Sequence, residues 1–559
     1  MNDDITLTIN PFNRVIHPQK GANLLDAFLE EGVEIPVLCN RNGSCGKCRV
    51  VVRAEANPPG DIERFSLGEL LINEGYRLAC RTEIRGSGEV LIPLEHHEDL
   101  LESAYVGNEL SAIKAEGFPH LPGKEPGRRR LPSGSMVALD IGTTTFSGYL
   151  FDHEGKLLSH ASLFNPTALY GADVITRLTR IQRSDNDFRK MRRSLLSGVK
   201  RILTVLCLRV SGPEGGGREE GIEHIGRMAI CGNTIMQHIF LGINPVEIGL
   251  FPYRPIVKDF LLMPMRALDD YGATGLNKDG ELLVAPSATG FIGGDAVCGI
   301  IAARLHLAQE PCLLIDLGTN GEIVLSCAGG LFAASASAGP AFEGYRISSG
   351  MRASVGAIDA VAIGDTLDVT YTVIGNGKPR GICGTGVVAA VAALLKARAL
   401  TSKGHIRPRR PTNRIRENTF IIAAKDETST GNPIVITDKD IGVLQQAKAA
   451  FAAGISCLLL AAGLEEKGLK KIFIAGAFGS RIDVDTLRTI GLIPSTIDCE
   501  VVALGNAAGI GVAQLLLSED AERDAVETAR KIKTIELSSH KDFEEHYMNA
   551  LFFKTHDDQ

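Results

Sequence analysis

The sequence has no excess of positive charge and no long apolar run. Its 559 residues include 59 lysines and arginines against 66 aspartates and glutamates, which gives a formal net charge of −7. Proteins that hold a nucleic-acid backbone usually carry a basic excess, so the composition argues against a nucleic-acid partner. Apolar runs such as 457–463 are too short to cross a bilayer, so we expect no membrane partner.

Two sequence signals are absent as well. The residues from Met1 to Asp4 have neither the basic nor the apolar part of a signal peptide, so we expect a cytoplasmic protein. The chain contains no Gly-x-x-x-x-Gly-Lys-Ser/Thr segment, which excludes a phosphate-binding loop of that type. Its length predicts roughly three or four domains.

Four of the twelve cysteines form a pattern. Cys39, Cys45 and Cys48 share one short glycine-containing segment, and Cys80 follows farther along the chain. A [2Fe-2S] cluster needs four thiolates that converge, and a tight loop with three cysteines plus one remote cysteine can supply them. Zinc ligands usually occur as two close pairs, and disulfides are uncommon without an export signal, so both alternatives fit less well. The pattern therefore predicts a [2Fe-2S] cluster. The other eight cysteines are expected to be mostly small buried hydrophobes.

The spacing and the flanking sequence indicate the fold of this region. Five residues separate the first two cysteines, one more than in plant-type ferredoxins, which resembles the adrenodoxin-like variant. Alternating residues at 6–9 and 14–16 predict a hairpin, 23–29 an amphipathic helix and 47–52 the next strand. We therefore expect a β-grasp ferredoxin domain over residues 1–94, followed by a linker over 95–134 that is rich in proline and glycine.

One short pattern occurs twice beyond the linker. The segment from Leu139 to Thr144 reads LDIGTT, and the segment from Ile315 to Asn320 reads IDLGTN. In each copy an apolar strand ends in aspartate, and a Gly-Thr turn leads into a second strand. The N–H groups of such a turn can bind phosphate oxygens, and the aspartate can hold Mg²⁺ directly or through water. Two facing copies would form a clamp around a nucleotide.

This repeat resembles the phosphate loops of the superfamily that contains acetate and sugar kinases, heat-shock ATPases and actin. Its other landmarks occur in the same order: 293–299 resembles the first connecting helix, 472–479 the adenosine loop and 505–509 the second connecting helix. Ala477 replaces the second of two glycines often present in the adenosine loop. The resemblance implies an α/β fold of two actin-like lobes with duplicated ribonuclease-H-like sheets, over residues 135–310 and 311–550.

The resemblance also implies the residues of an ATP site. Asp140 and Asp316 would serve Mg²⁺·ATP, and Asp295 would orient an attacking water. The implied nucleotide-binding residues are Gly142, Thr143, Thr144, Gly318, Thr319, Asn320, Gly384, Thr385, Gly386, Gly476 and Gly479.

Three local interpretations stay open. The turn at 384–386 opens an apolar helix, so its N–H groups could meet a phosphate, or the glycines could serve close packing. His238 is a ligand or, more in keeping with its apolar surroundings, a satisfied core histidine. Glu343 is an acid near the phosphates or a solvated loop carboxylate.

A ferredoxin domain joined to this ATPase resembles the reductive activators of corrinoid-dependent methyltransferases and of corrinoid iron-sulfur proteins. The resemblance rests on the cysteine loop, on both phosphate loops and on 232–234, 293–295, 337–344 and 381–386. It implies that the cluster takes one electron from a low-potential ferredoxin or reductase and passes it to Co(II) of a corrinoid protein, with ATP as the driving force. No cysteine follows Cys499, which places the chain with the [2Fe-2S] branch of this family.

Two other functions remain open from the sequence. Activators of dehydratase-type or radical enzymes couple a related ATPase to electron transfer, but they hold a [4Fe-4S] cluster at a dimer interface. A kinase with a redox-sensing ferredoxin domain would use the same two modules differently. The sequence also leaves open which corrinoid protein is served, the physiological donor and whether the chain forms a homodimer.

Overall fold

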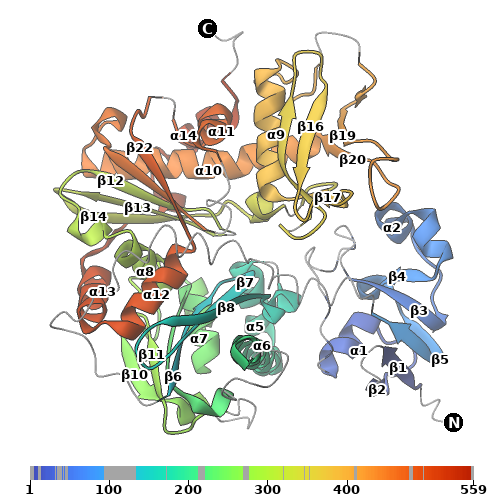
Figure 1. Cartoon of the computed structure of the whole chain (residues 1–559), viewed down its shortest axis with the longest axis horizontal. Helices are drawn as coiled ribbons and strands as arrows, with labels where there is room; N and C mark the ends of the chain where they lie inside the picture. Colours follow the sequence, from blue (N-terminus) through green and yellow to red (C-terminus); the bar gives the residue numbers. More distant parts are fainter. Residues whose placement is uncertain are drawn as a thin grey trace.

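The computed structural model describes most of the chain outside the cysteine loop and the linker. The described residues are 5–10, 14–31, 33, 35, 41, 43, 48–92, 134–171, 173–211, 221–268, 276–318, 320–344, 346–351, 353–407, 412–476, 483–494 and 496–554. Figure 1 shows a small amino-terminal body (blue) beside two larger α/β lobes. The predicted linker lies almost entirely outside the described residues.

The amino-terminal body is a mixed sheet with the strand order β2-β1-β5-β3-β4. Its elements are β1 (Leu7–Asn10), β2 (Arg14–Ile16), α1 (Leu24–Glu30), β3 (Arg49–Ala56), α2 (Asp61–Asn73), β4 (Tyr76–Leu78), the 3₁₀ turn η1 (Ala79–Arg81) and β5 (Ile84–Leu91). Strand β1 pairs antiparallel with β2 and parallel with β5. The predicted hairpin and helix are confirmed. The helix begins after Asn23 because the Asn23 side chain accepts the backbone N–H groups of Leu25 and Asp26.

The first lobe contains a six-stranded sheet with the order β10-β11-β9-β6-β7-β8. Its strands are β6 (Ser135–Ile141), β7 (Thr145–Phe151), β8 (Leu157–Phe164), β9 (Ile225–Gly232), β10 (Leu261–Pro264) and β11 (Glu281–Val284). Its helices are α5 (Val174–Arg183), α6 (Asp185–Ser211), α7 (Thr234–Leu241) and α8 (Gly294–Ala302). All of β9 is buried, as expected for a central strand covered on both faces.

The second lobe repeats this plan with the order β22-β21-β12-β13-β14-β23. Its strands are β12 (Cys312–Asp316), β13 (Gly321–Cys327), β14 (Gly330–Ala336), β21 (Lys471–Ala475), β22 (Glu500–Gly505) and β23 (Lys533–Thr534). In both lobes the first three strands pair antiparallel in sequence order, and the first strand also pairs parallel with a later strand. The predicted duplication of the lobes is confirmed by this matching topology.

Further elements belong to the same part of the chain, some of them beside this sheet and some next to the first lobe (Figure 1). They comprise two three-stranded sheets and six helices, which are β15 (Ala357–Ile363), β16 (Val369–Val373), β17 (Gly381–Ile382), α9 (Gly384–Lys396), β18 (Ile415–Arg416), β19 (Thr419–Ala423), β20 (Ile434–Thr437), α10 (Asp438–Ala462), α11 (Val484–Ile490), α12 (Ala507–Leu517), α13 (Glu519–Lys531) and α14 (Phe543–Leu551). Helix α9 begins at the predicted position.

Two helices join the lobes. Helix α12 follows β22 of the second sheet, yet it packs with buried residues of β6 and β9 in the first lobe. Helix α8 packs against α12 and reaches β12 of the second lobe. Their contact is tight, because a Cβ atom at Gly511 would lie 2.0 Å from the carbonyl oxygen of Cys298. The crossing of α8 and α12 therefore ties the two sheets together.

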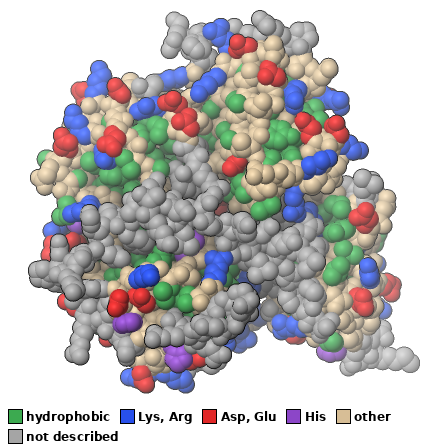
Figure 2. All heavy atoms as spheres, viewed as in Figure 1, with side chains coloured by type: hydrophobic (Ala, Val, Ile, Leu, Met, Phe, Trp, Pro, Cys, Tyr) green, Lys and Arg blue, Asp and Glu red, His purple; other side chains and the backbone are tan. Residues whose placement is uncertain are grey.

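Helix α10 is long and apolar enough to cross a membrane, by length and composition. The sequence shows only shorter apolar runs here because polar residues such as Gln445 and Lys448 interrupt them. Most of the helix is buried inside the second lobe, including both of these side chains. Helix α10 is therefore a core helix of this lobe. On the face drawn in Figure 2, acidic and basic side chains are intermixed over the described surface.

Candidate functional site

The described cysteines of the predicted cluster site converge. Cys48 precedes β3 and Cys80 lies in η1, and their sulfur atoms are 3.3 Å apart in a buried position. This separation is a contact between two thiols and not a disulfide bond, which would be about 2 Å long. Cys39 and Cys45 lie outside the described residues. Two buried sulfurs brought together without a bond fit a pair of cluster ligands.

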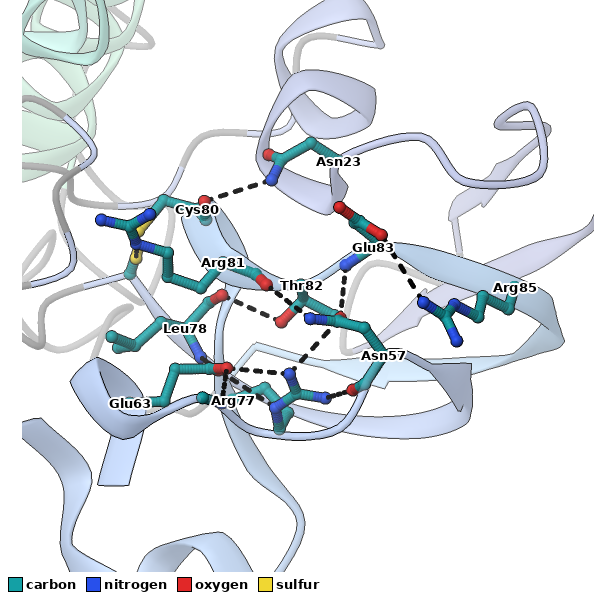
Figure 3. Close-up of polar contacts among 12 residues, drawn as sticks. Asn23, Asn57, Glu63, Arg77, Leu78, Cys80, Arg81, Thr82, Glu83 and Arg85 are labelled. Atoms are coloured by element: carbon teal, nitrogen blue, oxygen red, sulfur yellow. Dashed lines mark hydrogen bonds and ion pairs between the residues drawn. The ribbon is translucent and has the colours of Figure 1, made fainter. Parts of the chain in front are cut away.

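A buried network holds the segment that carries Cys80 (Figure 3). Arg77 donates to both carboxylate oxygens of Glu63, at 3.0 and 2.9 Å, and Glu63 also accepts the backbone N–H of Leu78 at 3.0 Å. Glu63 is 1 % exposed and Arg77 is 7 % exposed. The Glu63–Arg77 pair therefore fixes β4 against α2 just before Cys80.

Two asparagines hold the other side of Cys80 (Figure 3). The Asn57 side chain donates to the carbonyl of Arg81 at 3.1 Å and accepts the N–H of Glu83 at 2.7 Å. The Asn23 side chain donates to the carbonyl of Cys80 itself at 3.1 Å. The backbone on both sides of this cysteine is thus fixed by buried or half-buried side chains.

Helix α2 also contacts the cysteine loop. The hydroxyl of Ser66 donates to the carbonyl of Gly43 at 2.7 Å, and Gly43 has a φ of +83°, which favours glycine. Ser66 lies one helical turn after Glu63, so both face the cluster region from one side of α2. One helix therefore contacts both Gly43 and the segment that precedes Cys80.

The predicted carboxylates come together where the two lobes meet. Asp140 is the last residue but one of β6, Asp316 ends β12 and Asp295 lies in the first turn of α8. Burial raises the pKa of Asp140 to about 7, with repulsion from Asp295 and then Asp316 as further causes. Burial and then Asp295 raise the pKa of Asp316 to about 7, and burial raises the pKa of Asp295 to about 6. These three side chains thus share one electrostatic environment.

Glu322 is a fourth member that the sequence analysis missed. It lies on β13 directly opposite Asp316 in the antiparallel register. Its pKa is raised by burial, then by Asp295 and Asp316. A signal was present, because Glu322 is the one charged residue in the apolar strand from Gly321 to Cys327.

The arrangement of the four carboxylates suits a shared divalent cation. No three acidic, cysteine or histidine side chains in the described ranges are close enough to enclose a metal ion by themselves. Magnesium is usually held by one or two carboxylates together with waters and substrate phosphates. The carboxylates therefore fit Mg²⁺ that arrives with a nucleotide.

Asn506 links the two lobes at this point. Its side-chain nitrogen donates to Asp140 at 3.0 Å, and its side-chain oxygen accepts the N–H of Gly509 at the start of α12. The thiol of Cys231 lies 3.9 Å from the other oxygen of Asp140. Asn506 was recognised only as part of a motif, and its contact joins residues 366 positions apart in the sequence.

Three side chains brace the first phosphate loop. Asn165 donates to the carbonyl of Gly142 at 2.7 Å, and Asn233 donates to the hydroxyl of Thr143 at 2.9 Å. Arg177 donates to the carbonyl of Thr143 at 2.6 Å. Thr144 completes this loop, and its carbonyl accepts the N–H of Asn165. The bracing residues come from the end of β8, from α5 and from the start of α7.

The second phosphate loop lies against the adenosine-loop motif. Gly318 and Asn320 are described, whereas Thr319 and Gly479 lie outside the described residues. The N–H of Leu317 donates to the carbonyl of Ala475 at 3.0 Å. Gly476 has a φ of +94°, and a Cβ atom there would lie 2.9 Å from a carboxylate oxygen of Asp316. Glycine is therefore required where the two motifs meet.

The turn at the start of α9 is closely packed. A Cβ atom at Gly384 would lie 1.7 Å from the carbonyl oxygen of Phe342, and one at Gly386 would lie 2.3 Å from that of Ile358. Thr385 is buried, with its hydroxyl 3.2 Å from the sulfur of Cys383. Close packing explains these glycines, and a phosphate contact at this turn stays a prediction.

The two remaining polar candidates have local explanations of different strength. His238 is buried, with Nδ1 2.7 Å from the carbonyl of Thr234 and Nε2 accepting the N–H of Val257 at 3.2 Å. It is a satisfied core histidine. Glu343 is half-buried at the end of the 3₁₀ turn Pro340–Glu343, and its predicted role stays open.

Three protein families match consecutive parts of the chain. The 2Fe-2S iron-sulfur cluster binding domain matches residues 7–85, the RACo middle region matches 135–308, and the C-terminal domain of RACo, the ASKHA domain, matches 310–559. A cluster-binding domain followed by an ASKHA domain agrees with the predicted order of modules.

Two individual relatives are similar to about three quarters of the chain. The chain is 34% identical over 430 residues to the corrinoid activation enzyme RamQ of Eubacterium limosum, covering 74% of this chain and 70% of RamQ. It is 26% identical over 451 residues to the [Co(II) methylated amine-specific corrinoid protein] reductase of Methanosarcina barkeri, covering 75% of this chain and 77% of that one.

A solved structure extends the similarity to nearly the whole chain. The reductive activator for corrinoid, iron-sulfur protein superposes with a TM-score of 0.68 at 28% identity, covering 98% of each chain. The fold, the order of domains and the identity to RamQ agree. This chain therefore belongs to the family of corrinoid activation enzymes, and within it joins a [2Fe-2S] ferredoxin domain to an ASKHA ATPase domain.

Proposed function

We propose that this protein reactivates a corrinoid protein by ATP-dependent, one-electron reduction of Co(II) to Co(I). The observation that carries the proposal is that one chain of this family contains a site suited to a redox cluster and a site suited to a magnesium-bound nucleotide. The converging thiols of Cys48 and Cys80 suit a redox cluster, and the carboxylates of Asp140, Asp295 and Asp316 suit a magnesium-bound nucleotide. Relatives named for corrinoid activation and for reduction of a Co(II) corrinoid protein support it.

In this proposal, Cys39, Cys45, Cys48 and Cys80 hold a [2Fe-2S] cluster, which when bound transfers one electron at a time. The chain's own contribution is to hold the ligands still and to exclude water. The hydrogen bonds of Glu63 and Asn57 fix the segment around Cys80, and both described sulfurs are buried. A rigid, dry site keeps the energy of reorganisation small when the charge changes.

At the second site, the proposed roles follow from position. Asp140 and Asp316 lie near the carboxyl ends of equivalent strands and would share Mg²⁺ with the nucleotide phosphates. Asp295 would orient the water that attacks the terminal phosphate. Asn506 holds Asp140 in place through the 3.0 Å hydrogen bond. The proposed nucleotide-binding loops are 142–144, 318–320 and the motif that begins at Gly476, with Gly479 and the turn at 384–386 as further candidates.

ATP is needed because reduction of Co(II) is uphill from ordinary donors. Each 100 mV of deficit corresponds to about 2.3 kcal/mol per electron. Hydrolysis can drive the step only if the ATP-bound and ADP-bound states bind the Co(II) partner with different affinity. The contact between Asn506 and Asp140 joins the lobes at the carboxylates, so a nucleotide there would bias how the lobes close.

The setting of the reaction is also proposed. The electron donor would be a low-potential ferredoxin or reductase, and the protein would act in the cytoplasm. The proposed division is a ferredoxin domain at 1–94, a linker at 95–134 that lets it reach donor and acceptor, and lobes at 135–310 and 311–550. Helix α12 lies in the second range but packs on the first sheet, so the lobes share this helix.

The experiment that tests the function combines the anaerobically purified protein with a Co(II) corrinoid protein and a low-potential reductant. Visible spectra are recorded with and without ATP. Appearance of the Co(I) band only with ATP supports the proposal. No change across several corrinoid partners, with the cluster demonstrably reduced, would favour a dehydratase-type activator or a redox-sensing kinase. A phosphorylated small molecule would identify the kinase.

A further inference from the structure

A fully buried guanidinium lies beneath the first phosphate loop. Arg177 on α5 is 0 % exposed. It donates to the carbonyl of Gly171 at 3.0 Å, to the sulfur of Met236 at 3.1 Å and to the carbonyl of Thr143 at 2.6 Å. All three acceptors are uncharged. In the described part of the chain, no carboxylate forms an ion pair with this arginine.

The nearest acidic side chain serves another purpose. Asp173 lies four residues before Arg177 and caps α5 by accepting the N–H of Thr176 at 2.8 Å. Its attraction only partly offsets burial, which lowers the pKa of Arg177 to about 9 and still leaves it charged at neutral pH. A buried charge without a counter-charge is expensive, and proteins usually avoid it. Such a charge calls for an anion that the protein itself does not supply.

The hydrogen bond to Thr143 indicates where that anion binds. In a trans peptide, the C=O of Thr143 and the N–H of Thr144 point in opposite directions. Because Arg177 binds the carbonyl, the N–H of the same peptide points away from the guanidinium. A charged donor on the carbonyl polarises the peptide and makes its N–H a stronger donor.

We propose that Arg177 supplies the counter-charge for the phosphates of a nucleotide bound at the loop that it contacts at Thr143. It is a positioning residue, since Nε and both terminal nitrogens of its guanidinium donate to acceptors within the protein. The inference rests on the proposed function, because it presupposes that ATP binds at this loop. The other braces of the loop, Asn165 and Asn233, are uncharged, so Arg177 alone among them contributes a net positive charge.

A purely structural role is the competing explanation. Arg177 also joins α5 to Met236 of α7, so it could serve only to hold these helices and the loop together. The two roles differ in what a substitution does. If Arg177 is only a structural brace, its replacement should lower the affinity of every ligand of the site to the same degree. If Arg177 is a counter-charge, its replacement should lower the affinity most for the ligands with the most phosphate charge.

The test compares Arg177→Gln, which keeps a hydrogen-bond donor but loses the charge, with Arg177→Lys, which keeps the charge. Dissociation constants of ATP, ADP, AMP and adenosine are measured by calorimetry on the full-length protein. Arg180→Gln is the matched control. Arg180 lies on the same helix, is half-buried and pairs with Asp187 at 3.0 Å, away from the loop.

For Arg177→Gln we expect ATP affinity to fall roughly ten- to a hundredfold, ADP affinity less and adenosine affinity not at all. Arg177→Lys should retain most of the ATP affinity, and Arg180→Gln should match the wild type. Equal losses for ATP and adenosine in both Arg177 variants would overturn the inference. If Arg177→Gln does not fold, the same comparison of ATP affinity with adenosine affinity is made on Arg177→Lys. If the wild-type protein binds no ATP, the proposed function fails before the inference is reached.

Discussion

The buried pair of Glu63 and Arg77 offers a quantitative test of how the cluster site is held. Replacing Glu63 by Gln keeps the size of the side chain but leaves Arg77, 7 % exposed, without its counter-charge. Removing one partner of a buried ion pair costs about 3–5 kcal/mol. With a denaturant slope of about 2 kcal/mol per molar urea for a small domain, the unfolding midpoint should fall by about 2 M.

The assay follows the visible absorbance of the cluster in anaerobic urea titrations. Because Glu63 also binds the N–H of Leu78, two residues before Cys80, loss of this pair and loss of the cluster should coincide. The matched control is Glu83→Gln, since Glu83 pairs with Arg85 at 3.8 Å on the surface (Figure 3). Ion pairs on the surface contribute about 0–1 kcal/mol to stability. The control should therefore lose the cluster absorbance at a urea concentration close to the wild-type midpoint.

A double substitution separates charge from packing. Replacing both Glu63 and Arg77 by Met removes the unpaired charge, so much of the lost stability should return. If Glu63→Gln and Glu83→Gln lose the visible absorbance of the cluster at the same urea concentration, the Glu63–Arg77 pair does not hold the segment around Cys80, and the prediction is refuted.

Three further predictions concern the ATPase lobes. Asp316→Asn should weaken ATP binding in the presence of Mg²⁺ and remove its dependence on Mg²⁺, with the cluster spectrum unchanged; retained Mg²⁺ dependence in calorimetry would exclude Asp316 as a ligand. Gly476→Val should weaken ATP binding at least tenfold, because its Cβ atom would lie 2.9 Å from Asp316; wild-type affinity would show that the loop moves freely. Burial lowers the pKa of Lys448 to about 8, whereas the unfolded chain keeps this proton to about pH 10.4. Between about pH 8 and about pH 10.4, the unfolding free energy of the wild type should therefore rise relative to that of Lys448→Met, by up to about 3 kcal/mol. Urea titrations across this pH range measure the difference between the two proteins, and a difference that does not change with pH would contradict the prediction.

Local patterns in the sequence predicted a large part of the fold. The hairpin of β1 and β2 and the helix after Asn23 follow from alternation and capping, which act over a few residues. The repeated Asp-x-Gly-Thr turn predicted two equivalent lobes, because each copy needs the same strand, turn and strand around it. The matching strand order of the two large sheets confirms this.

The missed features depend on distant contacts or on burial. The hydrogen bond between Asn506 and Asp140 exists because α12 crosses to the other lobe, which no local pattern encodes. Arg177 and Glu63 are charged residues on helices, and such residues usually face solvent. Their burial is decided by what packs around them, so no local pattern indicates it. Glu322 was within reach, since a lone carboxylate in an apolar strand is unusual.

We expect one electron to pass to cobalt from the proposed cluster at Cys39, Cys45, Cys48 and Cys80 only when ATP is present. Freeze-quench EPR on the reduced protein mixed with a Co(II) corrinoid protein measures the signals of the reduced cluster and of Co(II) in the same samples. These two signals should disappear together, in equal amounts, only with ATP. Loss of the Co(II) signal at the same rate without ATP, or with the cluster still reduced, would contradict it.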